Sequence, residues 1–421
     1  MSAPNAVPTL CLGCGCLCDD IRLTLAAGRI TEIANACTLG ERWFGDGLLP
    51  QVCRVGEQPA SLDRAIGAAA ELLFTEPGRL LIYVAGDATC DAQRQAVALA
   101  DRLGASIDGP TSDTVAEGLL AAQRRGRASA TLGELRHRAD AVLFWGVDPQ
   151  TRYPRFMERF VFAASMHVKQ RRLFAVDVGD DVAPSECSER LALDAGDEVD
   201  ALSVMRAALR GEVFSGLPAA LNAAAELAKR LAAAHRYVAV VFDAEPSETP
   251  RDPALAEGLI ALVQQLNSST RAALFGLRSG GNRNGLESVL TWQTGYPFAV
   301  DFGSGFPRYR GSEPAAERLG GNRYATALVI GSPATVPAAV SEHLGRIRCV
   351  AIGPRASAAS FNPRIAIDTG LAGLHEGGLL LRMDDVPIER QAPLPAPQSL
   401  AGILKQLTME ISKSEAQEFQ K

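Results

Sequence analysis

Short apolar segments alternate with alanine-rich segments along most of the chain, and this alternation restricts the fold more than any other feature. Buried strands of a parallel sheet are continuous apolar runs, and a helix between two such runs returns the chain to the same end of the sheet. The chain is therefore expected to be an α/β protein with largely parallel sheets. The pattern predicts a helix over residues 91–103 and strands over 80–84, 105–107, 141–145, 172–176, 237–242, 271–275, 325–330 and 348–352.

Glycine or proline follows four of these expected strands, in residues 85–87, 145–149, 276–281 and 330–333. In open α/β sheets the carboxyl ends of the strands border the ligand crevice, so these loops together indicate a lined cleft. The alternative is that loops between strands and helices simply need turn residues. No Walker-type loop occurs, and no G-x-G-x-x-G opens a helix after a strand, so the sequence does not favour a nucleotide-binding fingerprint.

The composition restricts the partners. The chain has 421 residues, 47% hydrophobic and 21% charged, which is typical of a soluble globular protein of two or three structural units. A formal net charge of −6 leaves no basic surface for nucleic acid, and no apolar run is long enough to cross a bilayer. The first ten residues lack the features of a secretory signal. We expect a cytoplasmic protein with neither nucleic-acid nor membrane partners.

Five of the nine cysteines cluster near the amino terminus. Cys11, Cys14, Cys18 and Cys37 have the spacing C-x2-C-x3-C-x18-C, and an expected hairpin separates the last of them from the other three. Four thiolates suit either a 4Fe-4S cluster or a structural zinc ion. Cys16 is an additional thiol that can replace a neighbouring ligand if the loop is rewound. The alternative is a set of reduced thiols without a metal.

No other pattern predicts chemistry. The five histidines are far apart in the sequence and form no zinc-binding pair, and no G-x-S-x-G segment indicates a serine hydrolase. Adjacent aspartates such as Asp180-Asp181 are typical of solvated turns. No catalytic residue is predicted from these patterns.

The cysteine run resembles the amino terminus of the B subunit of formylmethanofuran dehydrogenase. The similarity includes residues 11–21, Asn35, Cys37 and Gly40, and it continues in the same order through 144–149, 154–155, 292–298, 300–302, 307–309, 376–378, 382–383 and 386–388. It extends over roughly residues 10–390. The resemblance implies a DMSO-reductase (molybdopterin oxidoreductase)-type scaffold of Rossmann-like α/β lobes with a small N-terminal four-cysteine metal domain.

On this resemblance we expect four regions. Residues 1–58 form the cysteine-rich, iron–sulfur-like metal domain. Residues 59–138 form the first α/β lobe, which 237–355 complete, and residues 139–236 form the second lobe. Residues 356–421 pack back on the core and end in a polar tail.

The chain departs from this family where its chemistry resides. Thr114 and Val115 stand where the family has a metal-ligating cysteine and a histidine. Asp148 replaces an asparagine, and Asp177 begins an acidic stretch where a dinucleotide pterin needs basic groups. Arg278 matches an active-site arginine. These five residues outline a vestigial cleft, and no tungsto- or molybdopterin is expected.

Such a chain resembles the B subunit of the formyltransferase/hydrolase complex of methylotrophic bacteria. The resemblance implies a one-carbon pathway in which formaldehyde is oxidised to formate through a formyl-methanofuran-type carrier. The implied partners are the amidohydrolase-type A component, the C component, the formyltransferase D component and the methanofuran-like carrier. The chain is then a non-redox structural component of an enzyme complex. Two alternatives remain open: an active tungsto- or molybdopterin dehydrogenase chain whose metal takes an oxygen ligand, and an electron-transfer role for the cysteines.

Overall fold

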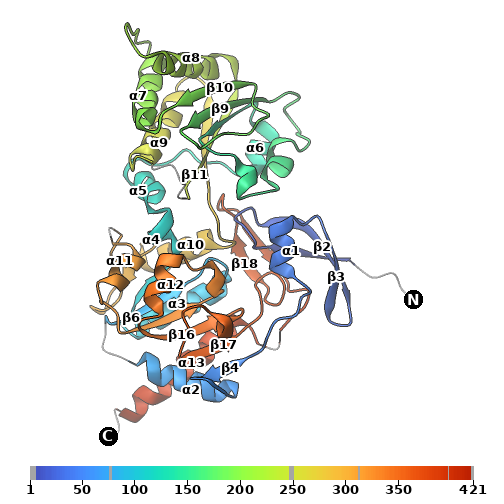
Figure 1. Ribbon diagram of the computed structural model, residues 1–421, viewed down its shortest axis with the longest axis vertical. Helices are drawn as coiled ribbons and strands as arrows, with labels where there is room; N and C mark the ends of the chain where they lie inside the picture. Colours follow the sequence, from blue (N-terminus) through green and yellow to red (C-terminus); the bar gives the residue numbers. More distant parts are fainter. Residues whose placement is uncertain (1–5, 75–77, 246–250, 312, 397, 419–421) are drawn as a thin grey trace. The chain divides into compact units, whose positions relative to one another are not determined.

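The structure is a computed structural model that describes residues 6–74, 78–245, 251–311, 313–396 and 398–418 (Figure 1). The chain forms two compact units. Unit 1 comprises residues 1–113 and 280–421, and unit 2 comprises the intervening residues 114–279. Each unit is built around its own, largely parallel β-sheet, which confirms the expected mixed α/β architecture.

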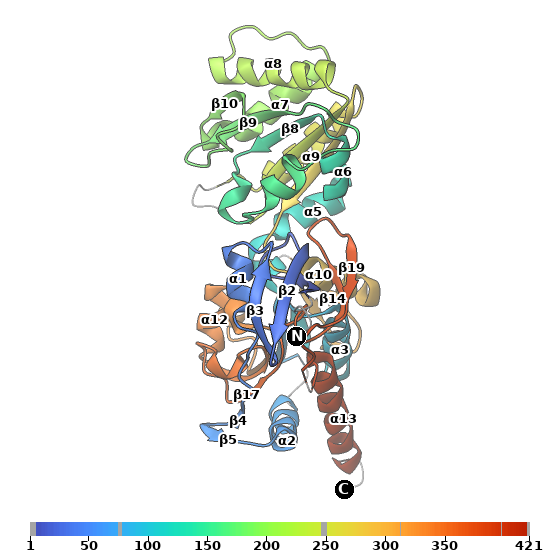
Figure 2. The same cartoon turned by 90° about the vertical axis from the view of Figure 1, so that its right-hand side faces the viewer.

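A three-stranded antiparallel sheet begins unit 1, and Figure 2 shows two of its strands, β2 and β3, side by side. It consists of β1 (Ala6–Cys11), β2 (Cys18–Ala26) and β3 (Arg29–Ala34). Pairing of β2 with β3 confirms the predicted hairpin, and its turn places Ala27 and Gly28 at positive φ. Helix α1 (Thr38–Phe44) follows directly.

The main sheet of unit 1 has nine strands in the order β14-β13-β7-β6-β15-β16-β17-β4-β5. The five central strands, from β7 to β17, are parallel, and the outer strands join antiparallel. The strands are β4 (Cys53–Val55), β5 (Gln58–Pro59), β6 (Leu80–Val84), β7 (Ser106–Asp108), β13 (Val300–Asp301), β14 (Arg308–Tyr309), β15 (Thr326–Ile330), β16 (Arg348–Gly353) and β17 (Ile365–Asp368).

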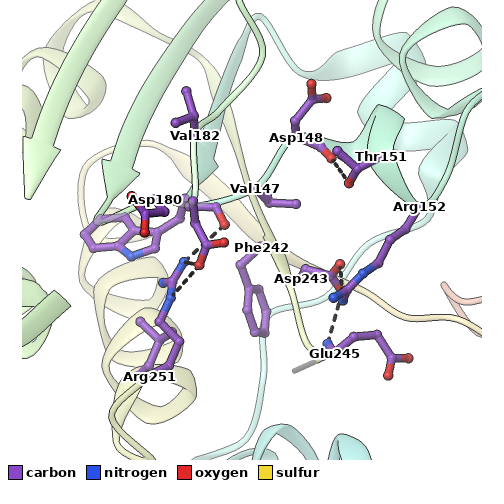
Figure 3. A pocket seen from close by; sticks show the side chains of 14 residues that line it. Val147, Asp148, Thr151, Arg152, Asp180, Val182, Phe242, Asp243, Glu245 and Arg251 are labelled. Carbon is purple, nitrogen blue, oxygen red and sulfur yellow. Dashed lines mark hydrogen bonds and ion pairs between the residues drawn. The ribbon is translucent and has the colours of Figure 1, made fainter. Parts of the chain in front are cut away.

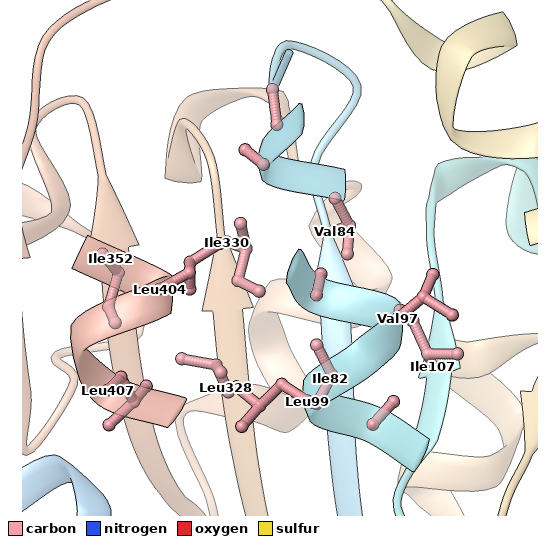
Figure 4. Packing of buried hydrophobic residues seen from close by; sticks show 14 of the residues in the cluster. Ile82, Val84, Val97, Leu99, Ile107, Leu328, Ile330, Ile352, Leu404 and Leu407 are labelled. Atoms are coloured by element: carbon pink, nitrogen blue, oxygen red, sulfur yellow. The ribbon is translucent and has the colours of Figure 1, made fainter. Parts of the chain in front are cut away.

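Helices cover both faces of this sheet because successive strand side chains point to opposite faces. Ile82, Leu328 and Ile352 pack with α2 (Leu62–Leu73), α3 (Cys90–Arg102), α10 (Arg283–Thr294) and α13 (Leu400–Glu418), as Figure 4 shows in part. On the other face, Leu81 and Val329 pack with α11 (Ala315–Gly320) and α12 (Ala338–Leu344). Each fully buried aliphatic side chain contributes about 2 kcal/mol of hydrophobic free energy. A short hairpin, β18 (Gly378–Leu381) and β19 (Pro387–Arg390), precedes α13.

Unit 2 contains a five-stranded parallel sheet in the order β10-β9-β8-β11-β12. One face forms a core with helices α5, α7, α8 and α9. The short helices α6 and η2, a π-helix, contact each other. The elements are α5 (Ala116–Arg125), α6 (Leu132–Arg138), β8 (Ala141–Trp145), η2 (Met157–Val161), β9 (Arg172–Val178), β10 (Glu189–Leu193), α7 (Glu198–Leu209), α8 (Ala219–Ala234), β11 (Tyr237–Asp243), α9 (Leu255–Leu266) and β12 (Arg271–Leu277).

The division of the chain differs from the expected regions. Strands β11 and β12 were expected to complete the first lobe, but β11 pairs with β8 and therefore lies in unit 2. Helices α5 and α6 also lie in unit 2, although residues 59–138 were expected to form one lobe. Strand β17, from the expected carboxyl-terminal region, pairs with β16. An apolar run reveals a buried strand, but it carries no information about which sheet the strand joins.

The sequence contains no apolar run long enough to cross a bilayer, and the helices of the structure agree with this. Among the described residues, no helix has the length and apolar character that crossing a membrane requires.

Candidate functional sites

The amino-terminal cysteines lie together at the end of the first hairpin. Cys11 and Cys18 are paired across β1 and β2, and the tight loop between them contains Cys14 and Cys16. These four thiols are buried, and Cys37, directly before α1, is half-buried. The fold therefore brings the widely spaced Cys37 into the neighbourhood of the other cysteines, as the hairpin predicted.

Two glycines leave room around the sulfur of Cys11. A Cβ atom on Gly13 would lie 3.4 Å from that sulfur, and one on Gly40 would lie 3.2 Å from it. The amide of Gly13 also donates a hydrogen bond to the same sulfur at 3.4 Å. Burial raises the pKa of Cys11, and the nearby thiols of Cys18, Cys14 and Cys37 raise it further. Such a group of buried thiols is poorly suited to carry negative charge unless a cation compensates it.

The described cysteine side chains are not arranged around a common point as metal ligands would be. Within the part of the chain that the structure describes, no group of three or more His, Cys, Asp or Glu side chains is arranged to hold a metal ion. The donor chemistry of the cluster nevertheless fits a soft metal, since the side chains near Cys11 are other cysteines.

A cavity of about 400 Å³ opens in unit 2 at the carboxyl ends of β8, β9 and β11 (Figure 3). Ligands of open α/β sheets bind where neighbouring strands have connections that lead in opposite directions. Here β8 is followed by β9 on one side, and β11 is followed by β12 on the other. We call this the switch-point cavity. Its wall is formed by residues 145–148, Thr151, Arg152, residues 180–182, Phe242, Asp243, Glu245, Arg251 and Leu255.

Arg251 organises one side of the switch-point cavity. Its guanidinium donates to Asp181 at 2.9 Å, to the carbonyl of Gly146 at 3.1 Å and to the carboxylate of Glu198. Trp145 donates to the same Glu198 oxygen at 2.7 Å. Gly146 has a φ of 52°, and a Cβ there would lie 2.1 Å from the guanidinium, so the close approach of Arg251 requires glycine.

Asp243 occupies another side of this cavity. Arg152 and the Tyr153 hydroxyl each donate to its carboxylate at 3.1 Å, and the Glu245 amide donates at 3.0 Å. Burial nevertheless raises the pKa of Asp243 to about 6, against the opposing effects of the Glu245 amide and Arg152. Desolvation therefore outweighs these favourable partners.

A second cavity of about 360 Å³ shares Phe242, Asp243 and Arg251 with the first. Thr114 and Val115, the two positions singled out in the sequence, form part of its wall. Val115 also lines a smaller cavity together with Arg278, which is buried. The structure thus gathers Thr114, Val115 and Arg278 around neighbouring cavities of unit 2, and it places Asp148 on the switch-point cavity.

Asp177 has a different position from the expected one. Its carboxylate accepts hydrogen bonds from Arg190, at 2.9 and 3.0 Å, and from the Ala183 amide at 2.8 Å. It therefore fixes the loop after β9, and it is not in the cavity wall. The acidic groups that face the switch-point cavity from this loop are Asp180 and Asp181.

Sequence reasoning missed Arg251, Glu198 and Asp243. Asp243 follows directly after the expected strand 237–242, so the rule that polar strand-end residues border the cleft was sufficient to select it. Glu198 begins a helix and Arg251 lies in a loop, and neither position carries a comparable signal.

Comparisons with known proteins agree with this fold. No family model matches the chain. The B subunit of the tungsten-containing formylmethanofuran dehydrogenase 2 of Methanocaldococcus jannaschii is 30% identical over 414 residues, which cover 93% of this chain and 94% of that protein. The corresponding protein of Methanococcus maripaludis is 28% identical over 430 residues, with 96% and 98% covered. The B subunit of the formyltransferase/hydrolase complex Fhc of Methylorubrum extorquens is 30% identical over 328 residues, with 76% and 85% covered.

A solved structure is also similar. The crystal structure of the formyltransferase/hydrolase complex FhcABCD from Methylorubrum extorquens with methylofuran contains a chain that matches with a TM-score of 0.73 and 26% identity. The match covers 86% of this chain and 99% of that one. Fold and sequence together define a B-type component of a one-carbon enzyme complex. The chain belongs to the family of formylmethanofuran dehydrogenase B subunits, which includes the B subunit of the Fhc complex.

Proposed function

We propose that the chain is the non-redox, structural B subunit of a formyltransferase/hydrolase complex, and that it has lost the pterin–metal centre of its dehydrogenase relatives. The observation that carries this proposal is Thr114-Val115 at the positions where the family has a ligating cysteine and a histidine. The proposal extends to the scaffold, which we assign to the DMSO-reductase type.

The surroundings of these two residues support the proposal. Thr114 is the last residue of the short helix α4 (Pro110–Thr114), and Val115 precedes α5 with a side chain that is 3% exposed. A neutral hydroxyl is a poor ligand for a metal that prefers thiolate. A buried valine offers no atom that binds or releases a proton.

The switch-point cavity also fits a dinucleotide pterin poorly. Asp148, Asp180 and Asp181 border it, and Arg251 is already bound to two carboxylates. A pyrophosphate at this place would meet negative charge at short range, which is unfavourable in a partly buried site. These groups support the absence of tungsto- or molybdopterin.

The amino-terminal cysteines fit a metal of a different kind. We assign Cys11, Cys14, Cys18 and Cys37 as ligands of a 4Fe-4S cluster or a zinc ion, with Cys16 as a further thiol. Their burial and the absence of side chains at Gly13 and Gly40 support this assignment. The metal would hold the loop, the hairpin and the start of α1 together.

The proposed partners are the other components of the complex. They are the amidohydrolase-type A component, the C component and the formyltransferase D component, with the methanofuran-like carrier as the molecule that they act on. Support comes from the solved FhcABCD complex, which was crystallised with methylofuran. We place the assembly in the cytoplasm.

The second candidate is an active dehydrogenase chain whose metal uses the Thr114 oxygen. The two tungsten-containing relatives, which match more than nine-tenths of the chain, favour it. This candidate requires formate-dependent electron transfer, which the structural role does not.

An activity measurement on the assembled complex separates the two candidates. The tagged chain is purified anaerobically with its natural partners, and formate-dependent viologen reduction is measured beside hydrolysis of the formylated carrier. We expect hydrolysis without viologen reduction, and unchanged hydrolysis in Thr114→Ala and in the control Thr335→Ala. Viologen reduction that Thr114→Ala abolishes and Thr335→Ala preserves would overturn the proposal.

A further inference from the structure

His375 joins two parts of unit 1 that are far apart in the sequence. The amide of Leu371 donates a hydrogen bond to its Nδ1 at 3.2 Å. Its Nε2 lies 2.9 Å from the carbonyl oxygen of Gly47. Because an amide N–H can only donate and a carbonyl oxygen can only accept, Nδ1 is the unprotonated nitrogen and Nε2 carries the hydrogen. The two contacts therefore fix His375 as a neutral imidazole in one tautomer.

Close packing keeps the ring in this position. A Cβ on Gly370 would lie 2.3 Å from the Cβ of His375, so the chain can pass beside this side chain only with glycine at residue 370. The backbone carbonyl of His375 also accepts a hydrogen bond from the Ala396 amide at 3.1 Å. The half-buried imidazole therefore has little freedom to turn away from its two hydrogen-bond partners.

The carbonyl that His375 contacts closes the segment that runs from β3 through α1. A Cβ on Gly47 would lie 3.0 Å from the side chain of Ile30 in β3. The Ile30 amide also donates to the carbonyl of Asp46 at 2.9 Å. We call residues 29–47 the β3–α1 segment. His375 lies 328 residues further along the chain than Gly47, so it connects this segment to a distant part of unit 1.

The titratable neighbours of the imidazole are bound to other groups. Asp46, Asp368 and Glu376 lie in the elements that surround His375. Asp368 and Glu376 are buried, and each carboxylate accepts hydrogen bonds from a hydroxyl and a backbone amide. The exposed carboxylate of Asp46 accepts a hydrogen bond from a backbone amide of its own loop. Residues 394–396, which also contact this turn, carry no titratable side chain.

Protonation would break one of the two contacts. An imidazolium carries an N–H on both nitrogens, so Nδ1 could no longer accept from Leu371, and two N–H groups would face each other. Burial disfavours the charged ring and lowers the pKa of His375, whereas the hydrogen bond to the Gly47 carbonyl raises it. The packed site thus favours the neutral ring, and a bound proton favours its release.

We propose that His375 is a pH-sensitive latch that holds the β3–α1 segment on the body of unit 1 when neutral and releases it when protonated. Cys37 lies in this segment, so the latch determines how firmly one of the four assigned metal ligands is held. That consequence rests on the proposed metal site, whereas the latch itself requires no metal.

Hydrogen exchange of the full chain, followed by mass spectrometry, tests the latch. Exchange of residues 29–47 is compared at pH 7.5 and pH 5.5 after correction for the intrinsic rate. A released imidazole titrates at about 6.5, so the population of the open segment should rise about tenfold between these pH values. Exchange should accelerate by a similar factor. Helix α2 of the same unit is the internal reference, and its exchange should not accelerate.

Variants assign the response to one side chain. His375→Gln has no group that titrates in this range, so exchange of residues 29–47 should change by less than about twofold between the two pH values. His375→Asn serves the same purpose if the glutamine variant does not fold. Glu376→Gln tests the buried neighbour and should keep the wild-type response. The control His167→Gln alters an exposed histidine of unit 2 and should also keep it.

Three results would overturn the latch: equal exchange of residues 29–47 at both pH values in the wild type, an undiminished pH response in the His375 variants, or loss of the response in Glu376→Gln. The proposed metal site fails in a different way. A purified chain without iron or zinc would remove the consequence for Cys37 and leave the exchange results unchanged.

Discussion

Each sheet has a switch point, the place where two neighbouring strands have connections that lead in opposite directions. The switch point is closely packed in unit 1 and borders an open cavity in unit 2. In unit 1 the corresponding point lies between β6 and β15, and Asp87 closes it by accepting hydrogen bonds from the Ser332 amide at 3.0 and 3.2 Å. In unit 2 the point between β8 and β11 borders a cavity of about 400 Å³.

Glycines explain much of this difference. A Cβ on Gly353 would lie 2.0 Å from the Gly331 carbonyl oxygen, and one on Gly331 would lie 2.7 Å from Asp87. The backbones after β6, β15 and β16 can therefore approach one another closely, which leaves little room between them. In unit 2, bulky and charged side chains such as Arg251 border the space without filling it. Topology selects the position of a crevice, and the first residues after each strand decide whether it stays open.

The largest effect is expected when the ends of β15 and β16, beside the closed switch point, are forced apart. Gly353→Ala brings a methyl group against the backbone of Gly331, so it should lower the free energy of unfolding by about 3 kcal/mol. Urea unfolding followed by circular dichroism measures the change. The control Gly67→Ala lies in α2 with open space around it and should stabilise the protein by up to about 1 kcal/mol. A loss below about 0.5 kcal/mol in Gly353→Ala would contradict the close packing.

Removal of the Arg251 guanidinium should lower the stability of unit 2 almost as strongly. Arg251→Ala leaves the buried Glu198 without its ion-pair partner, and we expect a loss of about 3 kcal/mol in the free energy of unfolding. The double variant Arg251→Met/Glu198→Gln should lose less than Arg251→Ala, because no buried charge is left alone. Urea unfolding of both variants tests this, and an equal or larger loss in the double variant would refute the ion-pair explanation.

The closed switch point should also respond to pH. Burial raises the pKa of Asp87 from 3.8 to about 6, so the folded protein binds a proton that the unfolded chain releases between these values. Stability from this group is therefore present at pH 4 and is lost as the pH rises through about 6. Between pH 4 and pH 7, the wild type should lose up to about 3 kcal/mol more than Asp87→Asn. Parallel pH profiles of the two proteins would be evidence against this assignment.

The smallest effect is expected at the rim of the open cavity. Asp180 is exposed, so Asp180→Asn should change the free energy of unfolding by less than about 0.5 kcal/mol. Thermal and urea unfolding check this value. A large loss would mean that this carboxylate supports the fold, in the manner of Asp87, and would weaken the contrast between the two switch points.

The regular parts of the fold could be predicted from the sequence, because a buried parallel strand is recorded locally as an apolar run. All the expected strands occur, as does the hairpin of residues 20–33. The helix expected over 91–103 also occurs. The membership of β11 and β12 in the second sheet could not be predicted, since strand pairing depends on contacts between distant segments.

The site could be predicted in part. The strand-end rule pointed to the loop that contains Asp148, and the cysteine spacing pointed to one cluster. The ion pairs of Arg251 were not predictable, because Asp181 and Glu198 lie 70 and 53 residues away from it. The strand-end rule also pointed to the loop of Asp87 as a possible crevice. In the structure, glycines at this place let the backbones pack closely together.

The central claim is that this protein has no pterin-bound metal. Elemental mass spectrometry of the anaerobically purified complex tests it most directly, through the amounts of tungsten, molybdenum, iron and zinc per copy of this chain. We predict no tungsten or molybdenum, together with either about four irons or one zinc bound at the cysteines, after subtraction of the metal in the hydrolase partner. About one tungsten or molybdenum per chain would contradict the account and assign the protein to the dehydrogenases.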